Sequence, residues 1–545
     1  MSRCPERISI SISASVIRQL LLMVTFWACV WVLFSYFYAS QQYKHRTVLL
    51  LRRELLQEVM GEATVASQQK EDIVTNVKIS ITKPPFLPEI NILKLLSKTS
   101  NLPLSYIKSN ISTDNLNGTC KNPPNIYDLD FNNIYWQRAR ISKATFFLFN
   151  AYYDKRKKVG KLPFVRLIGM IDKLNPPESF CRFWYLNGTN LKYLDSEVTY
   201  TYMWYDKWGN YKDGILQPFI MSCHLPSLPS LPEIPDSVSI VGKKCQKITN
   251  NMKIMYRNST KREDFAVCVK GLDFLLEDLS VRLVEWIEML GILGAKKIFF
   301  YELEVHPNVS KVLSYYVDQG LVELTSLTLP GKQPNLPGFR HLYLKSKIVN
   351  KRQNELIPYN DCLYKNLYSY KYLALLDIDE IIMPLKHQSW KSLMDEILTH
   401  WKEKNSTRSS YDFMNTYFLD HLQEENKIHE KDIPMYFHML QHVYRSNYTS
   451  PGSYVKCFHD VDEVVSLHNH FPRHCFGECN SFSVNISLAH LQHYRRDCVD
   501  ALKEACDTFK NHTTRDTSIW RFKDELIRKA NKILFHLNFY QETGL

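Results

Sequence analysis

Hydrophobic residues follow three patterns along the chain, and the first is one long apolar run. Residues 20–39 contain no charged side chain. About 20 apolar residues at 1.5 Å each span the hydrocarbon core of a membrane. A cleaved signal peptide has a shorter apolar region and a small-residue cleavage site. We therefore expect a transmembrane signal anchor at 20–39, preceded by a cytosolic tail at 1–19.

The second pattern is a series of short apolar runs that follows a polar stretch. Residues 40–125 are mostly polar and contain paired prolines, which is typical of a stem. From residue 126 onward, β-branched or aromatic runs such as Thr145–Phe149 and Val198–Trp204 are separated by turn residues. This pattern favours a small antiparallel β domain. A proline-rich linker follows, so we assign 126–250 to a β-rich domain and its linker.

The third pattern is an alternation of apolar strands with amphipathic helices after residue 262. Val284 and Ile287 recur at helical spacing in a segment that begins at Ser280. Such alternation predicts right-handed βαβ crossovers and a parallel, Rossmann-like sheet, and thus an α/β domain at 262–525. Ligands of these sheets bind beyond the carboxyl ends of the strands. The expected elements are strands at 265–269, 297–301 and 321–324, a helix from 280 to near Gly291 or Gly294, and a helix at 308–319.

An acidic motif follows the next expected strand, Tyr372–Leu376. Asp377 and Asp379 are two positions apart, so in extended geometry both side chains point to the same side. Two carboxylates placed in this way can bind Mn²⁺ or Mg²⁺, which also takes diphosphate oxygens. Two further Asp-X-Asp matches, at 128–130 and 460–462, do not directly follow an apolar strand of this series. We interpret those two as surface carboxylates.

Histidines downstream offer a further ligand, because a site with two aspartates often takes a neutral imidazole as well. By spacing alone, each of them is more often structural. Cys475 and Cys479 lie beside His474, but an oxidising compartment favours a disulfide over a zinc site. The downstream histidines are His459, His468, His470, His474, His490 and His493.

Composition and charge narrow the class of protein. The chain has 545 residues, a formal net charge of +12 and 45% hydrophobic residues, which excludes intrinsic disorder and allows two or three domains. The positive charge is spread along the chain, so it favours anionic ligands only weakly and does not by itself decide about nucleic acid. We expect no nucleic-acid partner. The sequence contains no Gly-rich phosphate loop and no Gly-X-Ser-X-Gly motif. Their absence argues against kinases, dehydrogenases and serine hydrolases.

Glycosylation sequons indicate the compartment. All of them follow the apolar run, so we expect a type II membrane protein whose C-terminal part is lumenal. Eleven cysteines also follow the run, which allows at most five disulfides and leaves one thiol, a possible link between two chains of a homodimer. The sequon asparagines are Asn110, Asn117, Asn187, Asn258, Asn308, Asn405, Asn447, Asn485 and Asn511.

Several segments between residues 215 and 525 occur in an order that matches one enzyme family. Among them are Phe265–Lys270, Tyr372–Glu380 and the closing His490–Arg495. In these segments the sequence resembles glycosyltransferase family 92. Further segments that carry the resemblance are 284–288, 293–295, 299–301 and 360–363.

The resemblance implies a GT-A fold and an inverting enzyme that takes galactose from UDP-galactose, with Mn²⁺ (or Mg²⁺) as cofactor. The family includes β-1,4-galactosyltransferases that act on the fucose of N-glycan cores, so the implied partner is a glycoprotein or oligosaccharide acceptor at the Golgi membrane. By this similarity Asp377 and Asp379 hold the metal ion and the diphosphate. Either His468 or His493 is then the third ligand.

The same resemblance suggests a uridine-side pocket and leaves the catalytic base open. It places Cys268, Lys270 and Glu285 near the nucleotide, with Lys270 on phosphate. Cys268 in a disulfide and Glu285 on a solvated helix face remain the alternatives. A carboxylate should take the proton of the attacking acceptor hydroxyl. The candidates for that base are Asp412, Asp460, Asp462 and Glu463.

Two other functions remain open at this point. One is a non-catalytic, membrane-anchored glycan-binding protein, although such a protein has no need for a diphosphate metal site. The other is the same class of enzyme with a different UDP-sugar donor, since a few hydrogen bonds distinguish hexoses.

Overall fold

The computed structural model describes residues 101–103, 122–187, 190–226, 229, 231–243, 246–402, 407–426, 431–498 and 503–540. The expected tail and signal anchor, and all but a few residues of the expected stem, lie outside these ranges. Within the described ranges, none of the helices combines the length and the apolar character needed to cross a membrane. The described residues belong to one compact unit that spans Ile90–Leu545.

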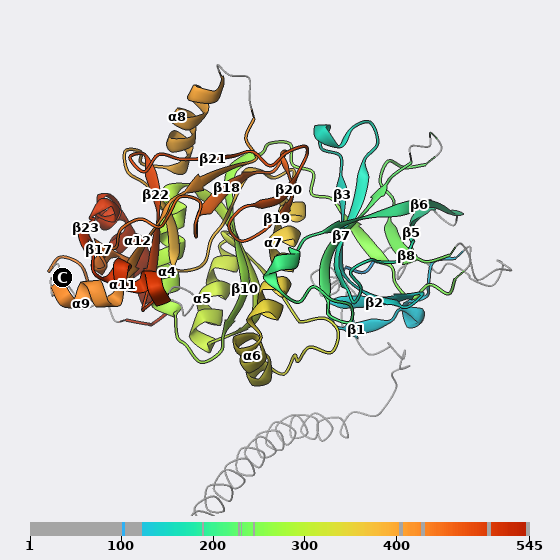
Figure 1. The fold of residues 1–545 in the computed structure, drawn as a ribbon, viewed down its shortest axis with the longest axis horizontal. Coiled ribbons are helices and arrows are strands. Elements are labelled where there is room, and N and C mark those ends of the chain that lie inside the picture. Colours follow the sequence, from blue (N-terminus) through green and yellow to red (C-terminus); the bar gives the residue numbers. More distant parts are fainter. Residues whose placement is uncertain are drawn as a thin grey trace, which may run out of the picture. The chain divides into compact units, whose positions relative to one another are not determined.

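The β-rich part forms a sheet with the strand order β1-β2-β3-β4-β7-β6-β5-β8-β9 (Figure 1). All pairings are antiparallel except that of β9 with β3, which closes the strands from β3 to β9 into a ring. The strands are β1 (Phe131–Asn133), β2 (Trp136–Ile141), β3 (Ala144–Asp154), β4 (Phe164–Ile171), β5 (Phe180–Asn187), β6 (Asn190–Tyr202), β7 (Gln217–His224), β8 (Ser237–Val241) and β9 (Met252–Met255).

The proline-rich segment after β7 does not end this sheet. It leads to β8, which pairs with β5, and then to β9, so the sheet extends beyond the expected linker to Met255. The ring encloses a core of buried residues that includes Phe146, Leu167 and Phe183. Cys181 and Cys223 are joined by a disulfide within that core.

The α/β part is built on a seven-stranded sheet with the order β12-β11-β10-β13-β18-β15-β21. The first four strands are parallel to one another, as the alternation predicted, and β18 is antiparallel to β13. The strands are β10 (Glu263–Phe274), β11 (Ala295–Val305), β12 (Val322–Ser326), β13 (Tyr370–Leu375), β15 (Ser410–Phe413), β18 (Lys456–Asp460) and β21 (Ser481–Ser483).

Helices connect the parallel strands, and two of them match the predicted helices closely. The helix that begins at Ser280 ends at Leu293, where Gly294 adopts the left-handed conformation with φ 110° that glycine tolerates best. The next helix starts at Pro307, one residue before the expected Asn308. The helices are α4 (Ser280–Leu293), α5 (Pro307–Asp318), α6 (Pro337–Ser346), α7 (Ile348–Asn366), α8 (Trp390–Lys402), α9 (Asp420–Asn426), α10 (His438–Gln441), α11 (Lys503–Lys510) and α12 (Lys523–His536).

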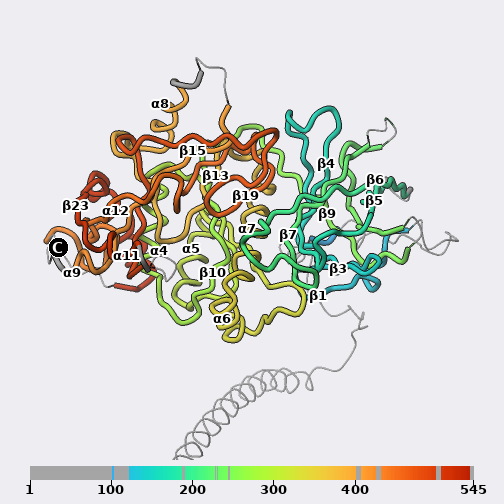
Figure 2. Tube along the Cα trace, viewed as in Figure 1, coloured from blue at the N-terminus to red at the C-terminus, as the bar shows by residue number. Residues whose placement is uncertain are grey.

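Smaller sheets complete the C-terminal part. β14 (Glu380–Pro384) and β16 (Asn415–Leu419) flank β22 (Ala489–Arg495) in a three-stranded sheet that begins directly after the acidic motif. β19 (Val464–Leu467) pairs with β20 (Pro472–Cys475) and lies beside α7, which precedes it by about a hundred residues (Figure 2). The remaining pair is β17 (Tyr444–Arg445) with β23 (Thr514–Arg515).

Candidate functional site

A pocket of about 370 Å³ opens at the carboxyl ends of β10 and β13. This is the edge at which parallel α/β sheets bind ligands. The acidic motif of residues 377–379 forms part of its lining. The other lining segments are 269–274 of β10, residues 277, 279, 282 and 283 before and in α4, Lys351 of α7, residues 438–439 of α10 and residues 494–497 at the end of β22 and just beyond it.

Asp377 lies two residues beyond the last residue of β13, and two lysines approach its carboxylate. Lys270 Nζ on β10 lies 3.1 Å from it, and Lys456 Nζ on β18 lies 3.5 Å away. The backbone N–H of Asp377 donates to Glu380 Oε2 at 2.8 Å, which makes a tight turn before β14. Burial alone would raise the pKa of Asp377, but the two ammonium groups outweigh it and hold that pKa below its ordinary value.

Asp379 is brought to a histidine by the pairing of β14 with β22. Glu380 lies opposite His493 in that pairing, and His493 Nε2 is 3.4 Å from Asp379 Oδ2. Burial raises the pKa of Asp379, but the effect of His493 is opposite and larger, so the pKa lies below its ordinary value. The second ring nitrogen of His493, Nδ1, is buried and has no hydrogen-bond partner.

Asp377, Asp379 and His493 are side chains of the types that bind a divalent cation. Asp377 and Asp379 supply hard oxygen donors, and His493 supplies an imidazole nitrogen with one ring nitrogen left without a hydrogen bond. Two carboxylates with one imidazole suit Mn²⁺, and oxygen donors also suit Mg²⁺. Lys270 lines the same pocket beside Asp377 and is placed to contact an anionic ligand.

Lys456 and Asn469 support the acidic motif, and sequence reasoning singled out neither of them. Lys456 is fully buried, and its Nζ lies 3.0 Å from Glu380 Oε2 and 2.6 Å from Asn469 Oδ1. Burial raises the pKa of Glu380, so the Lys456 ammonium is needed to offset the burial of this carboxylate. No local motif marks Lys456, because its place depends on the antiparallel pairing of β18 with β13.

Of the two candidate histidine ligands, the structure brings only His493 to the aspartates. His468 packs its ring against Trp208 and Phe471, with centroids 4.6 and 4.7 Å apart. Its ring belongs to an aromatic cluster between the two parts of the chain, so the proposal of His468 as third ligand needs correction. Aromatic packing explains the burial of this side chain without a metal ion.

The four carboxylates considered as catalytic base also lie elsewhere. Asp460 is opposite Tyr372 at the start of β13, whereas the pocket lies beyond the end of that strand. Asp462 pairs with Arg262 just before β10, and Glu463 pairs with Lys158. Asp412 accepts a hydrogen bond from Ser483 on β21. None of these four belongs to the described lining, so a base has to be sought among the carboxylates that line the pocket.

Cys268 and Glu285 hold the walls of the site instead of lining it. Cys268 is buried in a disulfide with Cys362 of α7, so it has no thiol to offer a nucleotide. Glu285 is also buried, which corrects both the expected ligand contact and the solvated alternative. Its carboxylate accepts the backbone N–H groups of residues 438, 439 and 440 at 2.8–3.0 Å. Burial raises the pKa of Glu285 to about 7, against these three hydrogen bonds.

The cysteines of the described residues are largely paired, as we expected for an oxidising compartment. Cys475 is bonded to Cys479, so this pair forms a disulfide and not a zinc site, and Cys498 is bonded to Cys506. Cys457 is a free thiol but is buried, which does not suit a link between two chains. Cys120 and Cys245 lie outside the described residues.

Most described sequons are accessible. Asn258, Asn447, Asn485 and Asn511 are exposed, whereas Asn308 is half-buried and donates to Asp278 at 2.6 Å. The side chains of the other sequons, Asn110, Asn117, Asn187 and Asn405, lie outside the described residues.

The comparisons with known proteins identify the class of protein as a glycosyltransferase. Residues 263–530 match the model of glycosyltransferase family 92, and this region of the chain therefore belongs to that family. No protein with curated annotation matches the sequence. Among solved structures, residues 1–349 of S. aureus TarS align at 10% identity over 52% of this chain and 76% of that chain, with a TM-score of 0.21. A likeness this weak adds nothing to the assignment.

Proposed function

We propose that this glycosyltransferase is an inverting enzyme of GT-A type that transfers galactose from UDP-galactose to a glycan acceptor. The proposed product is a β-1,4-galactoside on N-glycan fucose or a related glycan. The observation that carries the proposal is that Asp377 and Asp379 line a pocket at the carboxyl end of β13, with Lys270 beside Asp377 and His493 3.4 Å from Asp379.

Residues in the pocket and beside it divide the work of the proposed reaction. Asp377, Asp379 and His493 would hold Mn²⁺ or Mg²⁺, which when bound takes up the charge that develops on the departing UDP. Lys270 adds a positive charge beside the diphosphate. The acceptor hydroxyl attacks the anomeric carbon from the face opposite to the departing UDP, and its proton passes to a carboxylate. Besides the acidic motif, the described carboxylates that line the pocket are Asp273, Glu277 and Asp497.

We further propose that the protein is a single-pass type II protein of the Golgi membrane. The apolar run at 20–39 would anchor it, with the catalytic domain in the lumen. Two kinds of observation support a lumenal address: four described sequons are exposed, and the described residues contain four disulfides.

The test uses purified full-length protein in detergent with a panel of UDP-sugars, Mn²⁺ and fucosylated N-glycans. We expect metal-dependent release of UDP and a product heavier by one hexose, with UDP-galactose as the preferred donor. Asp377→Asn and Asp379→Asn should each lower transfer by at least roughly 100-fold, because each removes a ligand of the ion that stabilises the leaving group.

A second Asp-X-Asp motif provides the matched control. Asp128 is exposed and does not belong to the pocket lining, so Asp128→Asn should transfer at the wild-type rate. Near-normal turnover by either variant of the acidic motif would refute the metal assignment. A different preferred hexose would change the donor but not the class of enzyme, and glycan binding without transfer from any donor would favour the glycan-binding alternative.

A further inference from the structure

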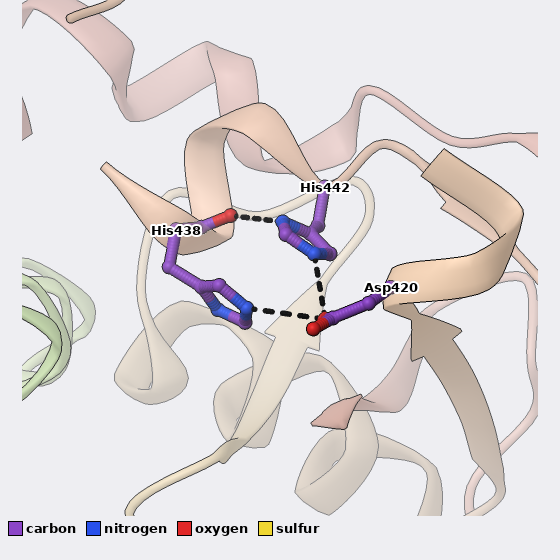
Figure 3. Close-up of side chains that lie close together, drawn as sticks. All are labelled: Asp420, His438 and His442. Atoms are coloured by element: carbon purple, nitrogen blue, oxygen red, sulfur yellow. Dashed lines mark hydrogen bonds and ion pairs between the residues drawn. The ribbon is translucent and has the colours of Figure 1, made fainter. Parts of the chain in front are cut away.

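Two histidines and an aspartate converge at a second place in the described residues, separate from the acidic motif. Asp420 is the first residue of α9, and His438 and His442 lie at the two ends of α10 (Figure 3). Both rings point their Nε2 atoms at the same carboxylate oxygen. His442 Nε2 lies 3.0 Å from Asp420 Oδ1, and His438 Nε2 lies 3.5 Å from it.

The hydrogen bonds of His442 show that a positive charge, from a proton or a metal ion, is needed between its ring and Asp420. His442 Nδ1 lies 2.6 Å from the backbone carbonyl oxygen of His438, which only accepts, so Nδ1 must carry the ring proton. In the neutral ring Nε2 is then a bare acceptor, and it faces a carboxylate oxygen that is also an acceptor. A proton or a metal ion between the two removes the conflict.

His438 points to the metal ion as the solution. Its side chain is nine-tenths buried, and its Nε2 has no hydrogen-bond partner although it is aimed at Asp420. A proton shared between His442 and Asp420 leaves the His438 nitrogen with only a contact of 3.5 Å, which is longer than an ordinary hydrogen bond. A cation bound to Asp420 and to both rings satisfies all three at once.

The distances also agree with a metal site. Metal–ligand bonds of about 2.0–2.1 Å at tetrahedral angles place ligand atoms about 3.3 Å apart, and the observed separations of 3.0 and 3.5 Å bracket that value. The bond from His442 Nδ1 to a backbone carbonyl is the outer-shell contact that orients metal-binding histidines. Two imidazoles and one carboxylate are a ligand set that Zn²⁺ accepts.

We propose that Asp420, His438 and His442 bind one Zn²⁺ ion, with a fourth position open to water or another ligand. The ion ties α10 to the start of α9. Because His438 and Met439 of α10 line the donor pocket, the ion would hold that wall in place. Glu285 secures the same helix through the backbone N–H groups of its first three residues, 438–440.

Zinc binding tests the proposal without an activity assay. Untagged full-length protein is stripped with a chelator and titrated with Zn²⁺ in competition with a chelating dye. Excess Mg²⁺ is present to occupy the acidic motif, since Mg²⁺ prefers oxygen ligands. We expect one Zn²⁺ per chain. His442→Gln and Asp420→Asn should weaken binding by roughly 100-fold or more, since loss of an outer-shell contact alone costs about 10–100-fold.

The control is His536→Gln, which changes an exposed histidine outside the cluster and should bind zinc as the wild type does. X-ray absorption of the zinc-loaded wild-type protein gives a second readout that does not depend on the folding of any variant. We expect two imidazole nitrogens in the first shell, at about 2.0 Å, and no sulfur. The proposal would be overturned if the wild type failed to bind one equivalent of Zn²⁺, if both variants bound Zn²⁺ as tightly as the wild type, or if the ion had a sulfur ligand. The cluster would then be an aspartate–imidazolium pair.

Discussion

Lys270 and Lys456 both contact Asp377, but they differ in burial, and this difference separates their roles. Lys456 is fully buried and also neutralises Glu380, whereas a quarter of the Lys270 side chain is exposed to the pocket. A buried charge is tolerated when it is paired and becomes costly when its partner is lost. We therefore assign Lys456 to the stability of the site and Lys270 to ligand binding.

Substitution of each lysine by methionine tests this assignment. Lys456→Met leaves Glu380 and Asp377 without their shared cation, so the free energy of unfolding should fall by about 3–5 kcal/mol. Lys270→Met should cost less stability, because water can reach Asp377 from the pocket, but it should weaken UDP binding. Urea unfolding and UDP titration of both variants are the measurements, and equal losses of stability would contradict the assignment.

A fully buried histidine on β18 predicts sensitivity to acid. Neither ring nitrogen of His459 has a hydrogen-bond partner, and burial lowers its pKa from 6.5 to about 3. Below pH 6.5 the unfolded chain therefore binds a proton that the folded protein does not, and stability falls as the pH falls. At about pH 5 this single group costs about 2 kcal/mol.

His459→Leu removes the titrating group and keeps the side chain apolar. The urea midpoint of the wild type should therefore fall more between about pH 7 and pH 5 than that of the variant. Parallel pH profiles of the two proteins would show that His459 does not contribute to acid sensitivity.

Asp377 and Asp379 could be found from the sequence because a local pattern, an apolar strand followed by alternating carboxylates, determines where they lie. The choice between His468 and His493 could not be made from spacing, because it depends on the pairing of β14 with β22. Lys456 is 79 residues from Asp377 in the sequence, and the contact exists only because β18 pairs with β13. Long-range register therefore supplies the part of the site that local patterns leave undetermined.

Among the strands and helices, those of the parallel sheet were the most predictable. Their hydrophobic periods are determined by burial on both faces of the sheet or on one face of a helix. The return of β8 and β9 to the first sheet was missed, because prolines between β7 and β8 have the composition of an interdomain linker. The antiparallel strand β18 was missed for a similar reason, since its pairing is set by distant segments.

The disulfide between β10 and α7 offers a test of how these elements are tied together. Cys268 and Cys362 are 94 residues apart, whereas Cys475 and Cys479 are 4 apart. In the chain-entropy model, a cross-link restricts the unfolded chain more when it closes a longer loop. Replacing the first pair by alanine should cost about 4–5 kcal/mol, and replacing the second should cost about 2 kcal/mol.

Denaturant unfolding of the two double variants under oxidising conditions measures the difference. The Cys475→Ala/Cys479→Ala variant serves as the control for loss of a disulfide as such. An equal loss in both variants would mean that loop length does not determine how much the Cys268–Cys362 disulfide stabilises the protein.

The two large sheets of the molecule share one hydrophobic core. Trp136, Phe149 and Tyr152 of the first sheet pack in the same buried cluster as Tyr301 and Leu373 of the second. The contact lies along α7, whose residues from Gln353 to Asn366 are almost all buried. Because a β-rich neighbour covers one face of the parallel sheet, the catalytic part depends on it for burial of apolar surface.

Asp361 of α7 lies at the centre of that contact and supports the last prediction. Its carboxylate accepts hydrogen bonds from Asn150 and Tyr152 of β3 and from Tyr301 of β11, the first and the last at 2.6 Å, and it pairs with Lys365. Asp361→Ala leaves two buried hydroxyls without their acceptor, while the Lys365 ammonium keeps Thr325 and Glu323. The free energy of unfolding should therefore fall by about 3–5 kcal/mol.

The matched control is Asp264→Ala at the start of β10. It removes an exposed ion pair with Lys371 and should cost at most about 1 kcal/mol. Hydrogen exchange followed strand by strand distinguishes a shared loss from a local one. If the two sheets unfold as one unit, Asp361→Ala should lower the protection of β3 and β11 by the same factor, because each strand then opens through the same global transition. Loss of protection in β3 alone would mean that the catalytic sheet is stable without its neighbour.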